Sequence, residues 1–154
     1  MTEAAGSGVR VRRLRYRDIS EVVRIERASF GTPWPAHEFA FELAKPAGIC
    51  LAAVADVDLA GYLVACRQGP LWNLRNVAVA QSSRRRGVGS ALLRALLEHK
   101  RLAGSHVVLE VRKSEHGAIA LYEQFGFYTA GRRPEFYGDD REDALLMWCS
   151  LPLG

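Results

Sequence analysis

A glycine-rich turn that carries three arginines is the stretch of this chain best suited to bind a charged group. It reads Arg-Arg-Arg-Gly-Val-Gly over residues 84–89, and a helical pattern of apolar residues begins within it. Glycine lets a backbone approach a ligand closely, and the free N–H groups and positive dipole of a helix N-terminus favour an anion. A plain turn with solvated arginines would have the same composition. The turn is therefore either a phosphate-binding turn or a solvated one.

Two other phosphate-binding motifs can be compared with this turn. A P-loop requires Gly-Lys-Ser/Thr, whereas this chain has Gly89 and Ser90 without a lysine, which excludes that motif. A dinucleotide-binding fingerprint requires a third Gly or Ala where this chain has Leu92, and its glycines follow the strand directly, whereas residues 80–86 intervene here. Glu110 lies 21 residues after Gly89, close to the place of a ribose-binding acid. The dinucleotide-binding fingerprint therefore remains an alternative, although this sequence lacks its third glycine.

A second motif at a fixed distance favours another interpretation. The chain reads Val-Leu-Glu-Val-Arg over residues 108–112 and Ala-Leu-Tyr-Glu-Gln-Phe-Gly-Phe over residues 120–127. Together with the glycine-rich turn, these motifs resemble the GNAT superfamily of acyl-CoA-dependent N-acyltransferases, and the resemblance extends over about residues 9–151. Asn-Val-Ala-Val at residues 76–79 and Arg-Glu-Asp-Ala-Leu at residues 141–145 are similar to the ribosomal-protein alanine N-acetyltransferases (RimI) and their archaeal relatives.

The resemblance implies a fold and an acyl donor. The fold would be α/β (α+β), with a mixed, mostly antiparallel central sheet of about seven strands, helices on both faces, and a splayed V between the fourth and fifth strands. The donor would be acetyl-CoA, without a metal. Its pantetheine arm and acetyl carbonyl would pair with the backbone of Val77, Ala78 and Val79. Its pyrophosphate would be bound by the turn and helix start, which comprise Arg85, Arg86, Gly87, Val88, Gly89 and Ser90.

The resemblance also implies that Glu110 is the general base and Tyr122 the general acid. Acyl transfer from a thioester to an amine needs an unprotonated amine and a proton for the departing thiolate. We expect burial of Glu110 in an apolar strand to raise its pKa toward neutrality. The structural alternatives are an ion pair of Glu110 with Arg112 or Lys113 and simple core packing of Tyr122.

Two aromatic segments correspond to the walls of the acceptor groove in the resembling family. We expect substrate contacts from Phe30 and Trp34 in one segment, and from Tyr137 in the loop at residues 132–143. The chain departs from the family at Glu115, because relatives usually place there an asparagine that binds the cofactor. No binding role is assigned to Glu115.

The spacing of apolar residues predicts a single domain over residues 9–154 after a flexible tail at residues 1–8. Helices are expected over residues 18–30, 37–44, 88–96 and 115–125, the first of them opened by a capping box from Asp18 to Glu21. Strands are expected over residues 9–17, 49–55, 59–65, 71–79, 105–111, 127–131 and 144–151, the first as an edge strand with a basic outer side.

Composition excludes several classes of protein. Apolar residues make up 49% and charged residues 25% of the chain, which excludes a disordered or collagen-like protein. Apolar runs fall short of the ~18 residues that a membrane span needs. The N-terminal segment lacks the apolar core of a signal peptide, so we expect a cytoplasmic protein with no membrane partner. Cys50, Cys66 and Cys149 are expected as reduced core thiols, and the histidines lack metal-ligand spacing.

Three functions are compatible with these patterns. The leading hypothesis is an acetyl-CoA-dependent N-α-acetyltransferase that modifies the N-terminal amine of a protein or peptide, with a ribosomal protein as a candidate acceptor. An α-amine has a pKa of ~7.7–8.0 against ~10.4 for lysine, so a modest base such as Glu110 suits it better. The second hypothesis is a small-molecule or lysine acetyltransferase. The third is a non-catalytic basic module that binds nucleic acid, a contact that we do not expect for the enzyme.

Overall fold

The computed structural model describes residues 2–3, 8–138 and 141–153. In these residues one mixed sheet has the strand order β1-β2-β3-β4-β5-β6-β8-β7, and each neighbouring pair is antiparallel except β5 and β6. The strands are β1 (Thr2–Glu3), β2 (Val9–Arg13), β3 (Gly48–Ala55), β4 (Asp58–Gln68), β5 (Leu71–Val79), β6 (His106–Arg112), β7 (Tyr128–Arg133) and β8 (Ala144–Ser150). The mostly antiparallel sheet expected from the sequence is confirmed, with β2 to β8 as its main strands.

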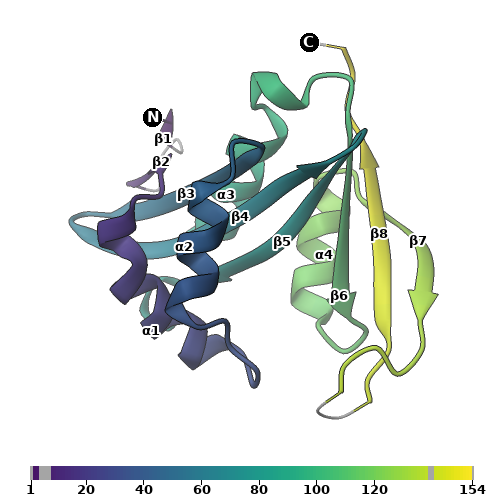
Figure 1. Ribbon diagram of the computed structural model, residues 1–154, viewed down its shortest axis with the longest axis horizontal. Helices are drawn as coiled ribbons and strands as arrows, with labels where there is room; N and C mark the ends of the chain where they lie inside the picture. Colours follow the sequence, from purple (N-terminus) through teal and green to yellow (C-terminus); the bar gives the residue numbers. More distant parts are fainter. Residues whose placement is uncertain (1, 4–7, 139–140, 154) are drawn as a thin grey trace.

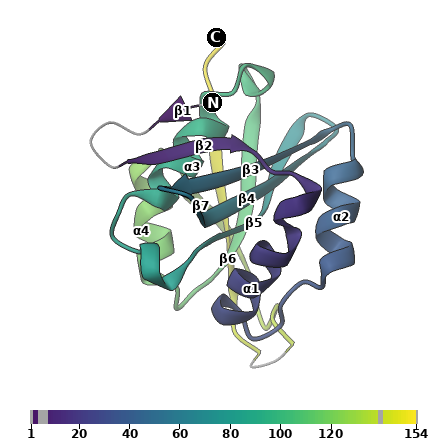
Figure 2. The same cartoon turned by 90° about the vertical axis from the view of Figure 1, so that its left-hand side faces the viewer.

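Helices cover both faces of this sheet (Figure 1 and Figure 2). α1 (Ile19–Ser29) and α2 (Ala36–Ala44) pack on one face, and α3 (Val88–Leu97) and α4 (His116–Gln124) on the other. Side chains alternate along β4, so Tyr62 joins the core layer under α1 and α2, whereas Leu63 joins the layer under α3 and α4. The described residues also form three short 3-10 turns: η1 (Tyr16–Asp18), η2 (Gln81–Ser83) and η3 (Lys100–Leu102).

The sheet opens between its one parallel pair, β5 and β6. Both strands are described in full, and they pair only where they begin, residues 71–73 of β5 against residues 106–108 of β6. Beyond this point they diverge (Figure 1), β5 continuing beside β4 and β6 beside β8. The facing backbone edges of the two strands therefore have no strand partner toward their C-terminal ends. This is the V expected between the fourth and fifth of the seven main strands.

A bulge interrupts β5 at the point where it leaves β6. The register with β4 changes from Asn76 opposite Val64 to Leu74 opposite Ala65, so Arg75 is an extra residue in β5. Such an insertion breaks the alternation of side chains along a strand. As a result both Arg75 and Asn76 reach the layer of α1 and α2, where Arg75 contacts Glu42 and Asn76 contacts Glu26.

The N-terminal strand is shorter than the sequence predicts. β2 ends at Arg13, and the chain turns into η1 because the Asp18 carboxylate binds the Arg12 guanidinium through both oxygens, at 2.8 and 2.9 Å, and accepts the Arg15 N–H at 2.8 Å. Arg12 thereby holds the pKa of Asp18 below its usual range. The expected capping box on α1 is also wrong, since Asp18 uses its oxygens here and makes no side-chain cap on that helix.

The expected tail at residues 1–8 is only partly described. Thr2 and Glu3 form β1, which pairs with Val11 and Arg10 of β2, so β2 is not the outermost strand. Residues 1 and 4–7 lie outside the described residues. Among the helices that the structure describes, none is long and apolar enough to cross a membrane.

Candidate functional site

The glycine-rich turn forms the N-terminus of α3. Arg85 and Gly87 both adopt left-handed backbone conformations, with φ of 65° and 76°. The helix starts at Val88, and the N–H of Ala91 donates to the carbonyl of Gly87 at 2.9 Å. The N–H groups before Ala91 therefore point out of the helix start without an intrahelical acceptor. A left-handed turn that leads into such a helix end is a concave set of donors suited to an anion.

Close packing fixes this turn at the open end of the V. A Cβ atom on Gly61 would lie 2.7 Å from the carbonyl oxygen of Ala78 and 2.9 Å from a methyl group of Val88, so only glycine lets α3 approach β4 and β5 this closely. On the other side, a Cβ on Gly89 would lie 3.1 Å from Leu121 of α4. A hollow of about 440 Å³ lies beside the turn, lined by α1 and by Ala80, Gln81, Ser82 and Arg84.

Glu110 lies on β6 with its side chain 31% exposed. Its neighbours Leu109 and Val111 pack in the core layer of α3 and α4, so strand alternation directs Glu110 to the opposite face of the sheet. The expected burial of Glu110 is therefore wrong. Arg133 of β7 brings its Nη1 to 3.7 Å from the Glu110 Oε1. The ion-pair partner thus comes from a distant strand rather than from the neighbouring residues that the sequence suggested.

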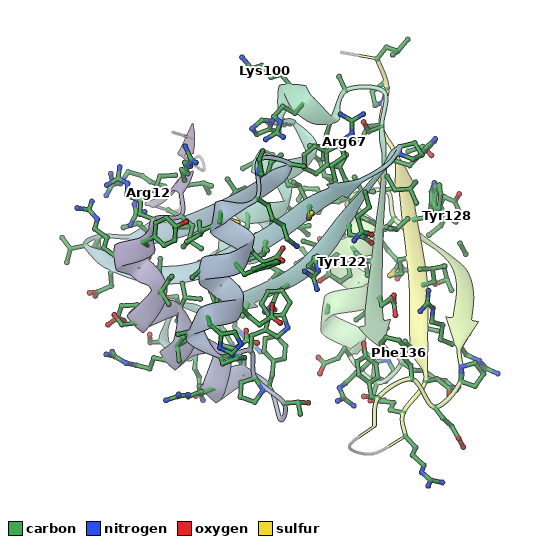
Figure 3. All side chains as sticks on the ribbon, in the orientation of Figure 1. Arg12, Arg67, Lys100, Tyr122, Tyr128 and Phe136 are labelled. Carbon is green, nitrogen blue, oxygen red and sulfur yellow. The ribbon has the colours of Figure 1, made fainter. Side chains whose placement is uncertain are left out.

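Tyr122 lies on α4 and is 7% exposed, with its ring edge-on to Phe127 at 5.7 Å. Figure 3 labels Tyr122 on α4, in the part of the view where β5 and β6 diverge. Burial raises the pKa of the Tyr122 hydroxyl, and the negative charge of Glu115 raises it further. The hydroxyl consequently keeps its proton at neutral and moderately alkaline pH.

The acceptor walls expected from the sequence lie on opposite sides of the V. On the β5 side, Trp34 packs against Phe39 at 5.3 Å, and the Arg75 guanidinium lies 5.2 Å from its ring. Phe30, at the end of α1, is 40% exposed. On the β6 side, the Arg112 guanidinium lies 4.0 Å from the ring of Tyr137.

Tyr137, which the sequence predicts to contact the acceptor, is influenced electrostatically by Glu110, one of the groups expected to transfer protons. Burial raises the pKa of its hydroxyl, Arg112 lowers it, and Glu110, Glu142 and Glu115 raise it. Glu115 therefore raises the pKa of both Tyr122 and Tyr137, and Glu110 raises that of Tyr137. The Arg112 guanidinium is further held by Glu142, at 3.3 Å.

Sequence reasoning missed Glu26, a buried carboxylate next to this site. It accepts hydrogen bonds from the Trp34 N–H and the Asn76 side chain, both at 2.9 Å, and from the Tyr62 hydroxyl. A signal for it was present, because Glu26 continues the apolar stripe of α1 at four residues after Val22. A carboxylate on a buried stripe requires donors from elsewhere in the fold.

Nothing in the described part of the chain gathers three or more metal-ligating side chains. The cysteines are buried, as expected for core thiols. Burial raises the pKa of Cys50 to about 11 and also raises that of Cys149. Both therefore stay protonated, which disfavours a cysteine nucleophile.

Comparison with known proteins agrees with this geometry. The acetyltransferase (GNAT) family matches the chain over residues 19–127. The N-alpha-acetyltransferase RimI of Mycobacterium tuberculosis is 35% identical over 119 residues, which cover 75% of this chain and 74% of that protein. The ribosomal protein bS18-alanine N-acetyltransferase of Escherichia coli K12 is 32% identical over 148 residues, which cover 88% of this chain and 92% of that protein.

The three-dimensional similarity extends over nearly the whole chain. The crystal structure of the ribosomal-protein-S18-alanine N-acetyltransferase from Escherichia coli matches with a TM-score of 0.86 and 28% identity, over 95% of this chain and 96% of that one. The N-alpha-acetyltransferase of Sulfurisphaera tokodaii is 29% identical over 160 aligned positions, covering 95% of both proteins. Matched over most of its length in both sequence and fold, the chain belongs to the acetyltransferase (GNAT) family.

Proposed function

We propose that this protein is an acetyl-CoA-dependent N-α-acetyltransferase that acts on the free N-terminus of a protein or peptide in the cytoplasm. The observation that carries the proposal is the V between β5 and β6, which ends at an anion-binding turn and has Glu110 and Tyr122 on its borders. Two of the relatives are named N-alpha-acetyltransferases, and a third is named a ribosomal protein bS18-alanine N-acetyltransferase. A ribosomal protein with a small first residue such as alanine is the acceptor we propose.

The acyl donor fits the backbone of this site. The unpaired edge of β5 at Val77, Ala78 and Val79 offers N–H and C=O groups to the amide-containing pantetheine arm. The pyrophosphate suits the left-handed turn and the helix start, with the side chains of Arg85 and Arg86 exposed beside it. The Gly87, Val88, Gly89 and Ser90 backbone completes this cradle. When bound, acetyl-CoA supplies the thioester that activates the acetyl group.

In the acetyl transfer, Glu110 accepts a proton and Tyr122 donates one. Glu110 is exposed enough to take a proton from the incoming ammonium, directly or through water. The amine nitrogen then forms its bond to the acetyl carbon as the carbon–sulfur bond breaks, and it loses its second proton to water to become the neutral amide. Tyr122 holds a proton because of its raised pKa and donates it to the departing sulfur. An α-amine, with a pKa of ~7.7–8.0, needs much less help from Glu110 than a lysine does.

The acceptor would be contacted from the two sides of the V by Phe30, Trp34 and Tyr137.

A direct test uses a synthetic peptide that begins with alanine and contains one internal lysine. Mass spectrometry after incubation with acetyl-CoA should find the acetyl group on the α-amine. A copy with a blocked N-terminus is the control and should stay unmodified. Acetylation mainly of the lysine, or only of free amino acids and polyamines, would instead identify a lysine or small-molecule acetyltransferase.

Replacing Gly87 with valine should weaken acetyl-CoA binding at least about tenfold. Gly87 has a φ of 76°, a conformation that costs a β-branched residue about 1–3 kcal/mol, so the turn shifts and its N–H groups lose their common direction. Isothermal titration with acetyl-CoA measures the change.

Gly69→Val is the matched control for this substitution. Gly69 has a similar φ of 60° and equally open surroundings, but it lies in the turn between β4 and β5, at the opposite end of β5 from the glycine-rich turn. It should lower the melting temperature without changing the affinity for acetyl-CoA. Unchanged affinity in a folded Gly87→Val protein would contradict the proposed pyrophosphate site.

A further inference from the structure

The Glu26 carboxylate is one of the most buried polar groups in the described part of the molecule, with 1% of the residue exposed. Its Oε2 accepts the backbone N–H of Trp34 at 2.9 Å. Its Oε1 accepts the Asn76 amide at 2.9 Å and the Tyr62 hydroxyl. Burial and the nearby Glu26 carboxylate raise the pKa of Tyr62, so the phenol stays a donor. Three donors from three segments therefore converge on a side chain that the proposed chemistry does not use.

These contacts join one wall of the V to the strand that forms its edge. Trp34 lies in the segment between α1 and α2, and Asn76 immediately precedes the β5 residues proposed to bind pantetheine. The bulge at Arg75 allows this connection, because it turns Arg75 and Asn76 to the same face. Asn76 reaches Glu26, while Arg75 lies 5.2 Å from the ring of Trp34 and binds Glu42 at 2.6 Å.

Trp34 is consequently held at two points. Its backbone N–H is held by Glu26, and its ring packs near both the Arg75 guanidinium, at 5.2 Å, and Phe39, at 5.3 Å. An irregular segment would otherwise have many backbone conformations open to it, and a hydrogen bond to a buried charged acceptor restricts them. A pre-ordered wall lowers the entropy that an acceptor must lose on binding.

We propose that Glu26 is a positioning residue that fixes Trp34 at the acceptor groove and thereby sets the affinity for the peptide substrate. This inference rests on the proposed function, because it assigns Trp34 to the acceptor. Glu26 does not reach the donor, whose strand β5 is held independently by pairing with β4 from residue 76 to residue 79. Losing the contact should therefore affect the acceptor and leave acetyl-CoA binding in place.

Glu26→Leu tests the inference, because it removes both acceptor oxygens and keeps an apolar side chain of similar size on the stripe. We expect the KM for the alanine peptide to rise about tenfold or more, the effect of losing a charge-assisted hydrogen bond, with the KM for acetyl-CoA within about twofold of wild type. Glu26→Gln should restore peptide KM, since its carbonyl oxygen can accept the Trp34 N–H. Tyr62→Phe is the matched control, because it removes a donor to the same carboxylate without touching Trp34.

Equal increases in both KM values, or an unchanged peptide KM in a folded Glu26→Leu protein, would overturn the inference. Native-state hydrogen exchange of the wild-type protein gives a second test that does not depend on the variant. The Trp34 amide should exchange far more slowly than those of its exposed neighbours Gly31 and Thr32. Equal exchange rates would show that Glu26 does not hold the segment. If the proposed function itself were wrong, the wild-type protein would leave the alanine peptide unmodified. That outcome can be told apart from the kinetic result and from the hydrogen-exchange result.

Discussion

Replacing Glu110 with glutamine is expected to lower kcat by about 10²–10⁴-fold, the usual contribution of a general base. The amide keeps the shape of the side chain and cannot take a proton. Glu110 lies on the face of β6 opposite to the α3 and α4 core, away from the turn proposed for the pyrophosphate. Acetyl-CoA affinity should therefore stay at the wild-type value. Single-turnover acetylation of the alanine peptide measures the chemical step directly.

An ion pair with a purely structural role would behave differently. Glu110 and Arg133 are 3.7 Å apart and both partly exposed, and such a pair contributes only about 0–1 kcal/mol to stability. Glu110→Gln and Arg133→Gln should accordingly have similar, near wild-type melting temperatures. Only Glu110→Gln should show the large loss of rate. Equal rates for Glu110→Gln and wild type under single-turnover conditions would remove Glu110 from the mechanism.

Tyr122→Phe is expected to lower kcat by a similar factor, about 10²–10⁴-fold, through loss of the general acid. Tyr122 is buried beside Phe127, so removing one oxygen leaves the packing of the ring in place. The raised pKa of Tyr122 means that its hydroxyl is protonated throughout the neutral and moderately alkaline range. The variant should therefore lower the rate at every pH in that range without shifting the alkaline limb of the profile.

Tyr128→Phe is the matched control for Tyr122→Phe. Tyr128 carries the same hydroxyl but is exposed on β7, outside the V (Figure 3). Its replacement should leave kcat unchanged. If Tyr122→Phe kept the wild-type single-turnover rate, Tyr122 would be a core aromatic residue without a catalytic role. A rate loss in both variants would point to a general effect of removing phenols rather than to proton donation.

The sequence alone determined the helices and most strands of this protein. Val88, Leu92 and Leu96 repeat at the spacing of one helix face, and α3 covers residues 88–97 as that spacing predicts. A run such as residues 105–111 has few ways to bury its side chains except as a central strand, and β6 lies there. The glycine-rich turn could also be predicted from the sequence, because Gly87 occupies a left-handed conformation that most residues avoid. These features depend on the spacing and the conformational preferences of residues close in sequence.

The exposure and the partners of the site residues could be determined only from the tertiary structure. The exposure of Glu110 follows from which face of β6 meets the helices, and its partner Arg133 lies on β7, two strands away in the sheet order. The end of β2 depends on Asp18 folding back onto Arg12 instead of capping α1. The Glu26 cluster needs Asn76, which is 50 residues away and is turned toward it by a bulge. Local spacing encodes each element, but a side chain's partners and solvent exposure depend on how distant elements pack together.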